Sequence, residues 1–351
     1  MSAPLRLGTR RSRLATTQSG WVADLLRSRG HAVEIVPIVT EGDVNAAPLT
    51  QIGGTGVFAS AIRQALHEER IDLAVHSLKD LPVAPEPGLV IAGIPPREDP
   101  RDALCARDGL TLEALPAGAR VGTGSPRRVA QLRTRRPDLD IVPLRGNVET
   151  RLQAVADGRL DAILLAYAGL TRLGLRAHVT QVLPTQLMLP APGQGALAVE
   201  CRTDREDVVA VLRDIDDAAT RRATSAERAL LAALEAGCTA PIGALAVPDG
   251  ETGLLLEAFA GTDTADLTFR DALTGAADAP EALGAALAQR LLDAGAHRLA
   301  GQAGQRLAPP SGSVTRDTRP DTDPPHDPED LVPPGASTRA AATEKIQECQ
   351  T

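Results

Sequence analysis

Short apolar runs alternate with amphipathic stretches along the first hundred residues. Leu5–Gly8 and Val33–Val39 are predicted strands, and the pattern between them is that of an amphipathic helix that ends at Gly30. The apolar face of this helix is expected to carry Leu14, Trp21, Val22, Leu25 and Leu26. A second helix over 57–69 precedes Ile71–Val75, which is predicted to be a buried strand. This order indicates an α/β fold with helical crossovers and a mostly parallel sheet.

The stretch His76-Ser77-Leu78-Lys79-Asp80-Leu81-Pro82 follows that strand and is expected to form a loop at its carboxyl end. Open α/β sheets bind ligands at this edge. The chain has 37 lysines and arginines together, but only Lys79 and Lys345 are lysines. A lysine kept beside an aspartate suggests that a compact ammonium group is needed there. The alternative is an ordinary surface charge.

The same alternation of strands and helices recurs between two proline-rich segments. Residues 95–101 and 190–195 interrupt regular structure and are predicted hinges. A strand over 196–201 is expected to return to the first part of the chain, because two neighbouring hinges imply that the chain crosses twice. We therefore predict two domains, which comprise 1–95 with 196–215, and 100–190.

The remainder is predicted to hold a small α+β domain over 218–304. It has a long helix from Ala218 to Glu235, three strand-like runs and a helix from Pro280 to about Ala294. Residues 306–351 are rich in Pro, Asp, Ser and Thr and are expected to be a disordered tail. The glycine-rich segment 40–56 is predicted to be a mobile lid.

Composition excludes several classes of protein. A net charge of -8 and an aromatic content of 1% argue against a nucleic-acid-binding protein. No apolar run approaches the roughly 20 residues of a membrane span, and the N-terminus lacks the pattern of a signal peptide. The four cysteines have no close spacing, so we expect neither disulfides nor a metal site. The expectation is a cytoplasmic protein without membrane or nucleic-acid partners.

Arginines recur where predicted strands give way to helices. Arg127 and Arg128 fall in the first turn of a helix that begins at Ser125-Pro126. Basic residues oppose the helix dipole there, so helix stability does not explain them. Arg10 and Ser12 occupy the equivalent place in the first domain, and Arg145 follows the next predicted strand. Arg151 falls one turn into its predicted helix, and Arg172 lies near the end of a short predicted helix. A cleft that binds several carboxylates or phosphates is indicated. The alternative is a set of solvated surface arginines.

Cys238 lies just after the long helix, within Gly237-Cys238-Thr239-Ala240-Pro241. The carboxyl end of a helix disfavours a thiolate, so this thiol is poorly suited to repeated nucleophilic catalysis. A small packed residue is the simplest interpretation. A single covalent attachment is the other.

Taken together, seven stretches resemble the hydroxymethylbilane synthase (porphobilinogen deaminase) family of tetrapyrrole biosynthesis. They are Leu5–Ser12, His76–Pro82, Gly122–Arg128, Leu144–Val148, Leu165–Gly174, Pro190–Glu200 and Gly237–Gly243. They occur in order over nearly the whole chain except the tail. In the glycine-rich segment, Gln51 and Thr55 stand where many family members have lysine.

The resemblance implies two lobes like those of type II periplasmic binding proteins, with mixed, mostly parallel sheets, and a small third domain. It implies a dipyrromethane cofactor held by a thioether to Cys238, with Asp80 as the catalytic carboxylate. Four porphobilinogen molecules would be condensed head to tail with loss of ammonia, and water would release linear hydroxymethylbilane. The residues expected to bind cofactor and substrate are Arg10, Ser12, Lys79, Ser125, Arg127, Arg128, Arg145, Arg151, Arg172 and Gln194. A monomer is expected.

Two other functions use the same arginine-lined cleft. A two-lobed solute-binding protein for an anionic ligand would give no reason for Cys238 or the third domain. The effector domain of a LysR-type regulator would be preceded by a helix-turn-helix motif, and none precedes the first strand.

Overall fold

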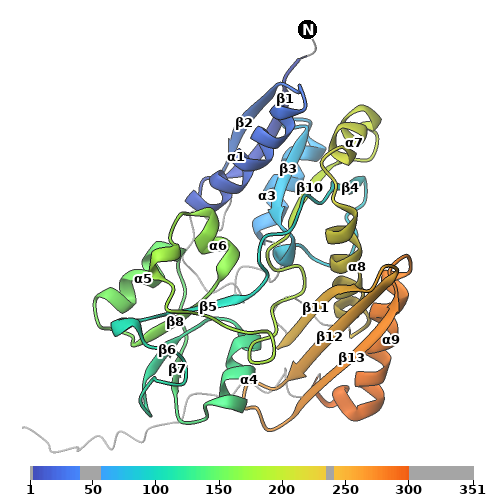
Figure 1. Ribbon diagram of the computed structural model, residues 1–351. Helices are drawn as coiled ribbons and strands as arrows, with labels where there is room; N and C mark the ends of the chain where they lie inside the picture. The colour runs from blue at the N-terminus through green and yellow to red at the C-terminus, as the bar shows by residue number, and fades with distance from the viewer. Residues whose placement is uncertain (1–2, 40–56, 235–240, 300–351) are drawn as a thin grey trace, which may run out of the picture. The chain divides into compact units, whose positions relative to one another are not determined.

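The computed structural model describes residues 3–39, 57–234 and 241–299. Three β-sheets and their covering helices make up the described chain (Figure 1). The predicted lid over 40–56, with Gln51 and Thr55, lies outside the described residues, as do Cys238 and the tail over 306–351.

The first sheet has the strand order β2-β1-β3-β10-β4. β1 is parallel to β2 and β3, whereas β10 is antiparallel to both β3 and β4. The predicted strand over 196–201 therefore returns to this sheet and lies between β3 and β4. The strands are β1 (Leu5–Arg10), β2 (Val33–Ile38), β3 (Leu73–Ser77), β4 (Leu89–Gly93) and β10 (Leu197–Arg202), and the helices of this part are α1 (Arg13–Ser28), α3 (Val57–His67) and α7 (Glu206–Arg213).

The second sheet repeats this arrangement in the order β7-β6-β8-β5-β9. Again one strand, β6, is flanked by two parallel partners, and two antiparallel pairs follow. The predicted pair of α/β lobes with mixed sheets is confirmed, but the expectation that the sheets are mostly parallel was wrong, because each sheet has two parallel and two antiparallel pairs. The elements are β5 (Asp102–Ala106), β6 (Arg120–Gly122), α4 (Pro126–Arg135), β7 (Asp140–Val142), α5 (Val148–Ala156), β8 (Ala162–Ala166), α6 (Tyr167–Arg172) and β9 (Gln181–Val182).

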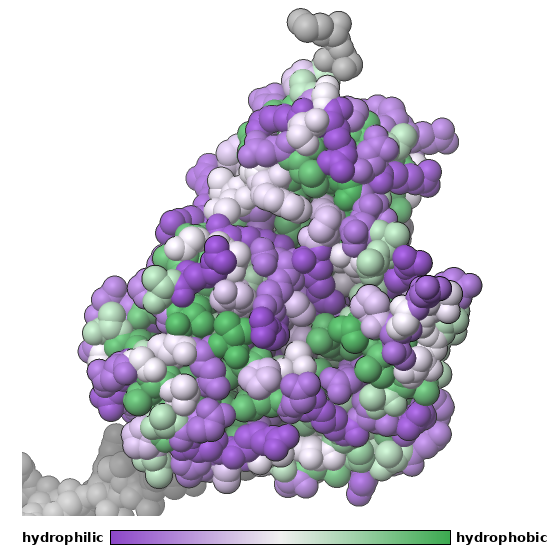
Figure 2. All heavy atoms as spheres, in the orientation of Figure 1, coloured by the Kyte–Doolittle hydropathy of each residue, from purple (hydrophilic) through white to green (hydrophobic). Residues whose placement is uncertain are grey.

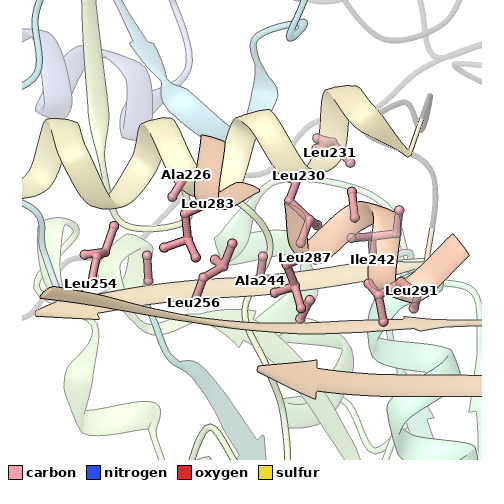
Figure 3. Packing of buried hydrophobic residues seen from close by; sticks show 14 of the residues in the cluster. Ala226, Leu230, Leu231, Ile242, Ala244, Leu254, Leu256, Leu283, Leu287 and Leu291 are labelled. Atoms are coloured by element: carbon pink, nitrogen blue, oxygen red, sulfur yellow. The ribbon is translucent and has the colours of Figure 1, made fainter. Parts of the chain in front are cut away.

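The third sheet is an antiparallel meander, β11-β12-β13, with α8 and α9 packed against it. Figure 3 shows the core between them, where Leu230 of α8 and Leu287 of α9 meet Leu256 of β12. Both helices are amphipathic, so one stripe of each is buried in this core. The elements are α8 (Ala218–Ala233), β11 (Ile242–Asp249), β12 (Gly253–Gly261), β13 (Thr268–Ala276) and α9 (Pro280–Leu291).

The sequence pattern misplaced one large side chain. Trp21 was expected on the apolar face of α1, but it is 44% exposed, while Val22 and Leu26 are fully buried. The buried stripe of α1 also includes Gln18 and Ser19. Trp21 lies about 100° around the helix from Val22, so it points away from the sheet. Gln18 can be buried because its side-chain amide has a partner: it donates a hydrogen bond to the Ser77 hydroxyl at 3.1 Å.

Cys105 and Cys201 lie in the sheets as core residues, as expected. Burial raises the pKa of both thiols, to about 12 for Cys105 and about 11 for Cys201, so both are protonated at neutral pH.

Hydrophilic residues cover much of the face seen in Figure 2, and hydrophobic residues occur there in separate patches. Among the described residues, no helix is long and apolar enough to cross a membrane.

Candidate active site

The polar residues after β3 do not all lie on a loop. β3 extends to Ser77, because its antiparallel pairing with β10 continues through Ala198 opposite His76 and Leu197 opposite Ser77. The prediction that the strand ends at Val75 and that His76 belongs to the loop was wrong. His76 is buried, with its Nε2 3.4 Å from a carboxylate oxygen of Glu200.

The rest of the predicted loop begins with a single 3-10 turn, Leu78–Asp80. The side chains of Leu78 and Leu81 are buried in one hydrophobic cluster, and Lys79 between them is partly buried. Asp80 is exposed. In the part of the chain that the structure describes, no hydrogen bond or ion pair engages the Asp80 carboxylate.

The second proline-rich segment packs directly on this turn. Gly193 has a φ of +73°, and a Cβ at this position would lie 3.3 Å from the Lys79 backbone nitrogen. Any larger residue would be strained and would push against the turn. Gly193 therefore permits the segment 190–195 to approach the backbone that carries Lys79 and Asp80. We call this segment and the first proline-rich segment, 95–101, the two linkers.

Arg127 and Arg128 converge on one buried carboxylate, that of Asp102 at the start of β5. Nη1 of Arg127 donates to Oδ2 of Asp102 at 2.8 Å, and Nη2 of Arg128 donates to Oδ1 at 2.7 Å. Asp102 has no exposed surface, and the two arginines are 3% and 5% exposed. Burial alone would raise the pKa of Asp102, but the two guanidinium charges outweigh it and hold the pKa far below its usual range.

Gln194 joins Lys79 to this cluster. Its side-chain amide donates to Asp102 Oδ1 at 2.9 Å and to the Pro100 carbonyl at 2.7 Å. Its Oε1 accepts from Nζ of Lys79 at 3.4 Å. Desolvation lowers the pKa of Lys79; Asp80 and Asp102 oppose this, while Arg127 and Arg128 add to it.

Three further arginines retain most of their hydrogen-bonding capacity. Nε of Arg151 donates to the Gly146 carbonyl at 2.8 Å, and Nη2 of Arg172 donates to the Gly195 carbonyl at 2.7 Å. Desolvation lowers the pKa of both, and the positive charges of Arg128 and Arg145 lower that of Arg151 further. Arg145 is exposed, and no hydrogen bond or ion pair links it to the described residues.

The remaining predicted residues lie at helix starts. Arg10 ends β1, and the Ser12 hydroxyl caps α1 by accepting from the Ala15 amide at 3.3 Å. Ser125 occupies the N-cap position of α4, but its side chain makes no capping hydrogen bond. Charges of six predicted residues thus interact in the structure: the charge of Lys79 interacts with those of Asp80, Arg127 and Arg128, and the charge of Arg151 with those of Arg128 and Arg145. The hydrogen bond that the Ser12 hydroxyl accepts stays within α1.

Comparison with known proteins assigns the family. Residues 5–210 match the family model described as porphobilinogen deaminase, dipyromethane cofactor binding domain, and residues 222–293 match the porphobilinogen deaminase C-terminal domain. This chain belongs to the porphobilinogen deaminase family.

Curated relatives in the porphobilinogen deaminase family match along most of their length. The porphobilinogen deaminase of Nocardia farcinica is 54% identical over 84% of this chain and 88% of its own length. That of Mycobacteroides abscessus is 52% identical over 85% of this chain and 100% of its own length. Among solved structures, a putative methionine-binding lipoprotein from Bacillus subtilis is 13% identical, with a TM-score of 0.38, over 60% of this chain and 89% of that one.

The site suits the cofactor of the porphobilinogen deaminase family. Each pyrrole of a dipyrromethane carries an acetate and a propionate, so the group brings several carboxylates. Arg145 is uncommitted within the described chain, and the buried Nε of Arg127 has no hydrogen-bond partner there. Guanidinium groups with unused donors are the usual partners of carboxylates. Among the described residues no cluster of histidines, cysteines and carboxylates could hold a metal ion.

Sequence reasoning missed Asp102, the residue that organises this site. An aspartate at the head of the apolar run over 102–106 is a local anomaly, because acidic residues are seldom fully buried without a partner. The sequence could therefore have shown that Asp102 is unusual. It could not identify the partners of Asp102, because Arg127 lies 25 residues and Gln194 92 residues further along the chain.

Proposed function

We propose that this chain is a hydroxymethylbilane synthase that joins porphobilinogen molecules head to tail with release of ammonia. The observation that carries the proposal is the Asp80 carboxylate, which is exposed on a turn next to Lys79, whose ammonium group also interacts with the charges of Arg127 and Arg128. An uncommitted carboxylate in a cationic site suits a substrate that carries one amine and two carboxylates.

Asp80 is proposed to act twice on each substrate. Its carboxyl group donates a proton to the leaving amine as the C–N bond breaks, and the bonding electrons depart with the ammonia. A positive charge remains on the methylene-pyrrole. The Asp80 carboxylate then stabilises this cation until the free α-carbon of the terminal pyrrole of the bound chain attacks the methylene carbon and forms the new carbon–carbon bond. The attacking carbon then loses its hydrogen as a proton, which restores the aromatic ring and returns the Asp80 carboxyl group to its protonated form.

The arginines are proposed to hold the carboxylates of cofactor and substrate. Arg145 and Arg151 would take them by forked hydrogen bonds, and Arg127 and Arg128 would supply charge from their buried position. Lys79, Arg172 and Gln194 line the same region, and Arg10, Ser12 and Ser125 are proposed to contribute from the starts of α1 and α4. When bound, dipyrromethane supplies the pyrrole carbon to which the first substrate is joined.

Several finer assignments belong to the same proposal. The cofactor is proposed to be attached through a thioether to Cys238, and the enzyme to be a cytoplasmic monomer. The proposed domains are 1–95 with 196–215, 100–190 and 218–304.

Intact-protein mass spectrometry tests the proposal directly. The wild-type chain should carry an adduct of two pyrrole units, and addition of porphobilinogen should give heavier species that differ by single pyrrole units. Cys238→Ser should lack the adduct, whereas the control Cys349→Ser should retain it. An unmodified wild-type chain that nevertheless releases ammonia from porphobilinogen would refute the attachment at Cys238.

A further inference from the structure

A single carboxylate lies at the centre of the cationic site. Asp102 accepts from Arg127 through one oxygen, and from Arg128 and Gln194 through the other. Arg128 also donates from Nε to the same Oδ1 at 3.2 Å and from Nη1 to the Leu164 carbonyl at 2.9 Å. Nη1 of Arg127 donates to the Leu189 carbonyl at 2.6 Å. Both guanidinium planes are therefore set by buried acceptors on neighbouring segments.

The orientation of Gln194 depends on the same carboxylate. Its amide nitrogen has two hydrogens, and these go to Pro100 O and Asp102 Oδ1. Both are acceptors, so only the amide nitrogen can face them. The amide oxygen must then face Lys79, whose ammonium needs an acceptor. A reversed amide would set donor against donor at Lys79 and acceptor against acceptor at Asp102.

The charges at this centre do not cancel. One carboxylate faces two guanidinium groups, and the Lys79 ammonium adds a further positive charge through Gln194. The surplus suits a ligand that carries carboxylates, and burial strengthens the attraction because the surroundings screen it weakly. Asp102 itself is fully enclosed and so cannot touch a ligand.

We propose that Asp102 is a positioning residue that presets Arg127 and Arg128 directly, and Lys79 through Gln194, for the carboxylates of the bound pyrroles. Preset donors strengthen binding because they lose no further freedom when the ligand arrives. The assignment of pyrroles as the bound ligand rests on the proposed function. The arrangement of the side chains around Asp102 does not depend on it.

Chemical labelling of Lys79 tests this hydrogen-bond network and does not depend on enzymatic activity. After cleavage at arginine, the peptide Ile71–Arg97 carries Lys79, and Lys345 in another peptide serves as the internal reference. The extent of amine acylation is measured against pH in the full chain. Asp102→Asn removes a negative charge that raises the pKa of Lys79, so the labelling midpoint of Lys79 should fall by roughly half a pH unit or more relative to Lys345.

A matched control separates this role from a general loss of charge. Asp99, three residues before Asp102 in the segment 95–101, is held by the Arg101 side chain at 2.6 Å and by the Arg101 backbone amide at 2.9 Å, and Asp99→Asn should leave the Lys79 midpoint unchanged. The KM for porphobilinogen should rise on the order of tenfold in Asp102→Asn, by analogy with the loss caused when residues that orient metal ligands are removed, and should be unaltered in Asp99→Asn.

Gln194→Leu keeps the test decisive if Asp102→Asn does not fold. It leaves the arginine pairs of Asp102 intact and removes the acceptor of Lys79, together with the hydrogen bonds that the amide donates to Asp102 and Pro100, so the labelling midpoint should fall while α4 remains in place. A wild-type midpoint in folded Asp102→Asn or in Gln194→Leu would overturn the proposal, as would an equal shift in Asp99→Asn. If the midpoints shift as expected but the wild-type chain forms no pyrrole adduct, the proposed function fails and the positioning role stands.

Discussion

Asp80 and Asp102 are two aspartates of one site with opposite environments. Asp80 is exposed on a turn, whereas Asp102 is enclosed and accepts hydrogen bonds from three side chains. A carboxylate that is saturated by two arginines stays ionised and is unsuited to proton transfer. The chemistry is therefore assigned to Asp80 and the positioning to Asp102.

Replacement of Asp80 by asparagine should abolish most of the ammonia release. The amide can neither donate a carboxyl proton nor neutralise the cation, and loss of such a group typically costs a factor of about 10²–10⁴. The measurement is the rate of ammonia production from porphobilinogen. Asp108→Asn is the control, because Asp108 is an exposed aspartate in another 3-10 turn. An Asp80→Asn enzyme with near-normal turnover would refute the assigned role.

At the scale of elements, α8 binds the two linkers, 95–101 and 190–195, and the end of the turn that carries Asp80. Glu227, fully buried, accepts from Nη1 of Arg97 at 2.6 Å, from the Gly193 amide at 2.6 Å and from the Ala246 amide at 3.0 Å. The next residue, Arg228, donates to the Leu81 carbonyl at 3.2 Å and the Pro82 carbonyl at 2.7 Å. Thus one helix fixes the linkers and the end of the turn that carries Asp80.

Arg228→Leu should loosen the turn that carries Asp80. Two carbonyls lose a charged donor, which should lower the free energy of unfolding by about 2 kcal/mol. The turnover number should fall as well, because Asp80 lies one residue before Leu81. Urea unfolding and steady-state rates measure the two effects. Arg222→Leu is the matched control, since the Nε of this exposed arginine donates within α8 to Ala218 O. Equal effects in both variants would contradict the assignment.

At the scale of the whole molecule, the two linkers run side by side. The Glu98 amide donates to the Gly195 carbonyl at 3.3 Å, and Nε of Arg97 donates to the Gln194 carbonyl at 2.8 Å. A bend in one linker must therefore bend the other. This pairing supports the hypothesis that the lobes move about these linkers as the bound chain of pyrroles grows.

Acid stability also belongs to the whole molecule, because buried carboxylates in both lobes contribute. Burial alone would raise the pKa of Asp72, Glu200 and Asp102, but in each the paired cations outweigh burial, and the pKa lies below its usual range. The partners are Arg6 and Arg205 for Asp72, His76 and Arg63 for Glu200, and Arg127 and Arg128 for Asp102.

A folded-state pKa below the unfolded value adds stability that is present above the unfolded pKa and is lost as the pH falls through the folded one. The free energy of unfolding should therefore drop as the pH falls below about 4, the value for unfolded Asp and Glu. Urea unfolding at a series of pH values measures this. Asp72→Asn should show a smaller drop, because one of the three contributions is removed. A wild-type free energy that does not change between pH 5 and pH 3 would contradict the prediction.

The sequence by itself determined the elements and the chemistry of their ends. Apolar periodicity located most of the strands and helices of both lobes, and the helix start at Ser125-Pro126 was correct, because such signals depend on neighbours a few residues apart. It also indicated Asp80 and the arginines by residue type. It missed β5, β9 and α7 and misplaced His76, because pairing with a distant strand, and not local pattern, sets where short elements begin and end.

Only the tertiary structure decided which charges are used by the protein itself. Arg127, Arg128 and Arg145 look alike in the sequence, yet two of them are buried against Asp102 and the third is exposed. Likewise Asp102, Gln194 and Glu227 gain their roles from partners in other parts of the chain. A buried charge is stable only when partners surround it, and partners far apart in sequence are brought together only by folding.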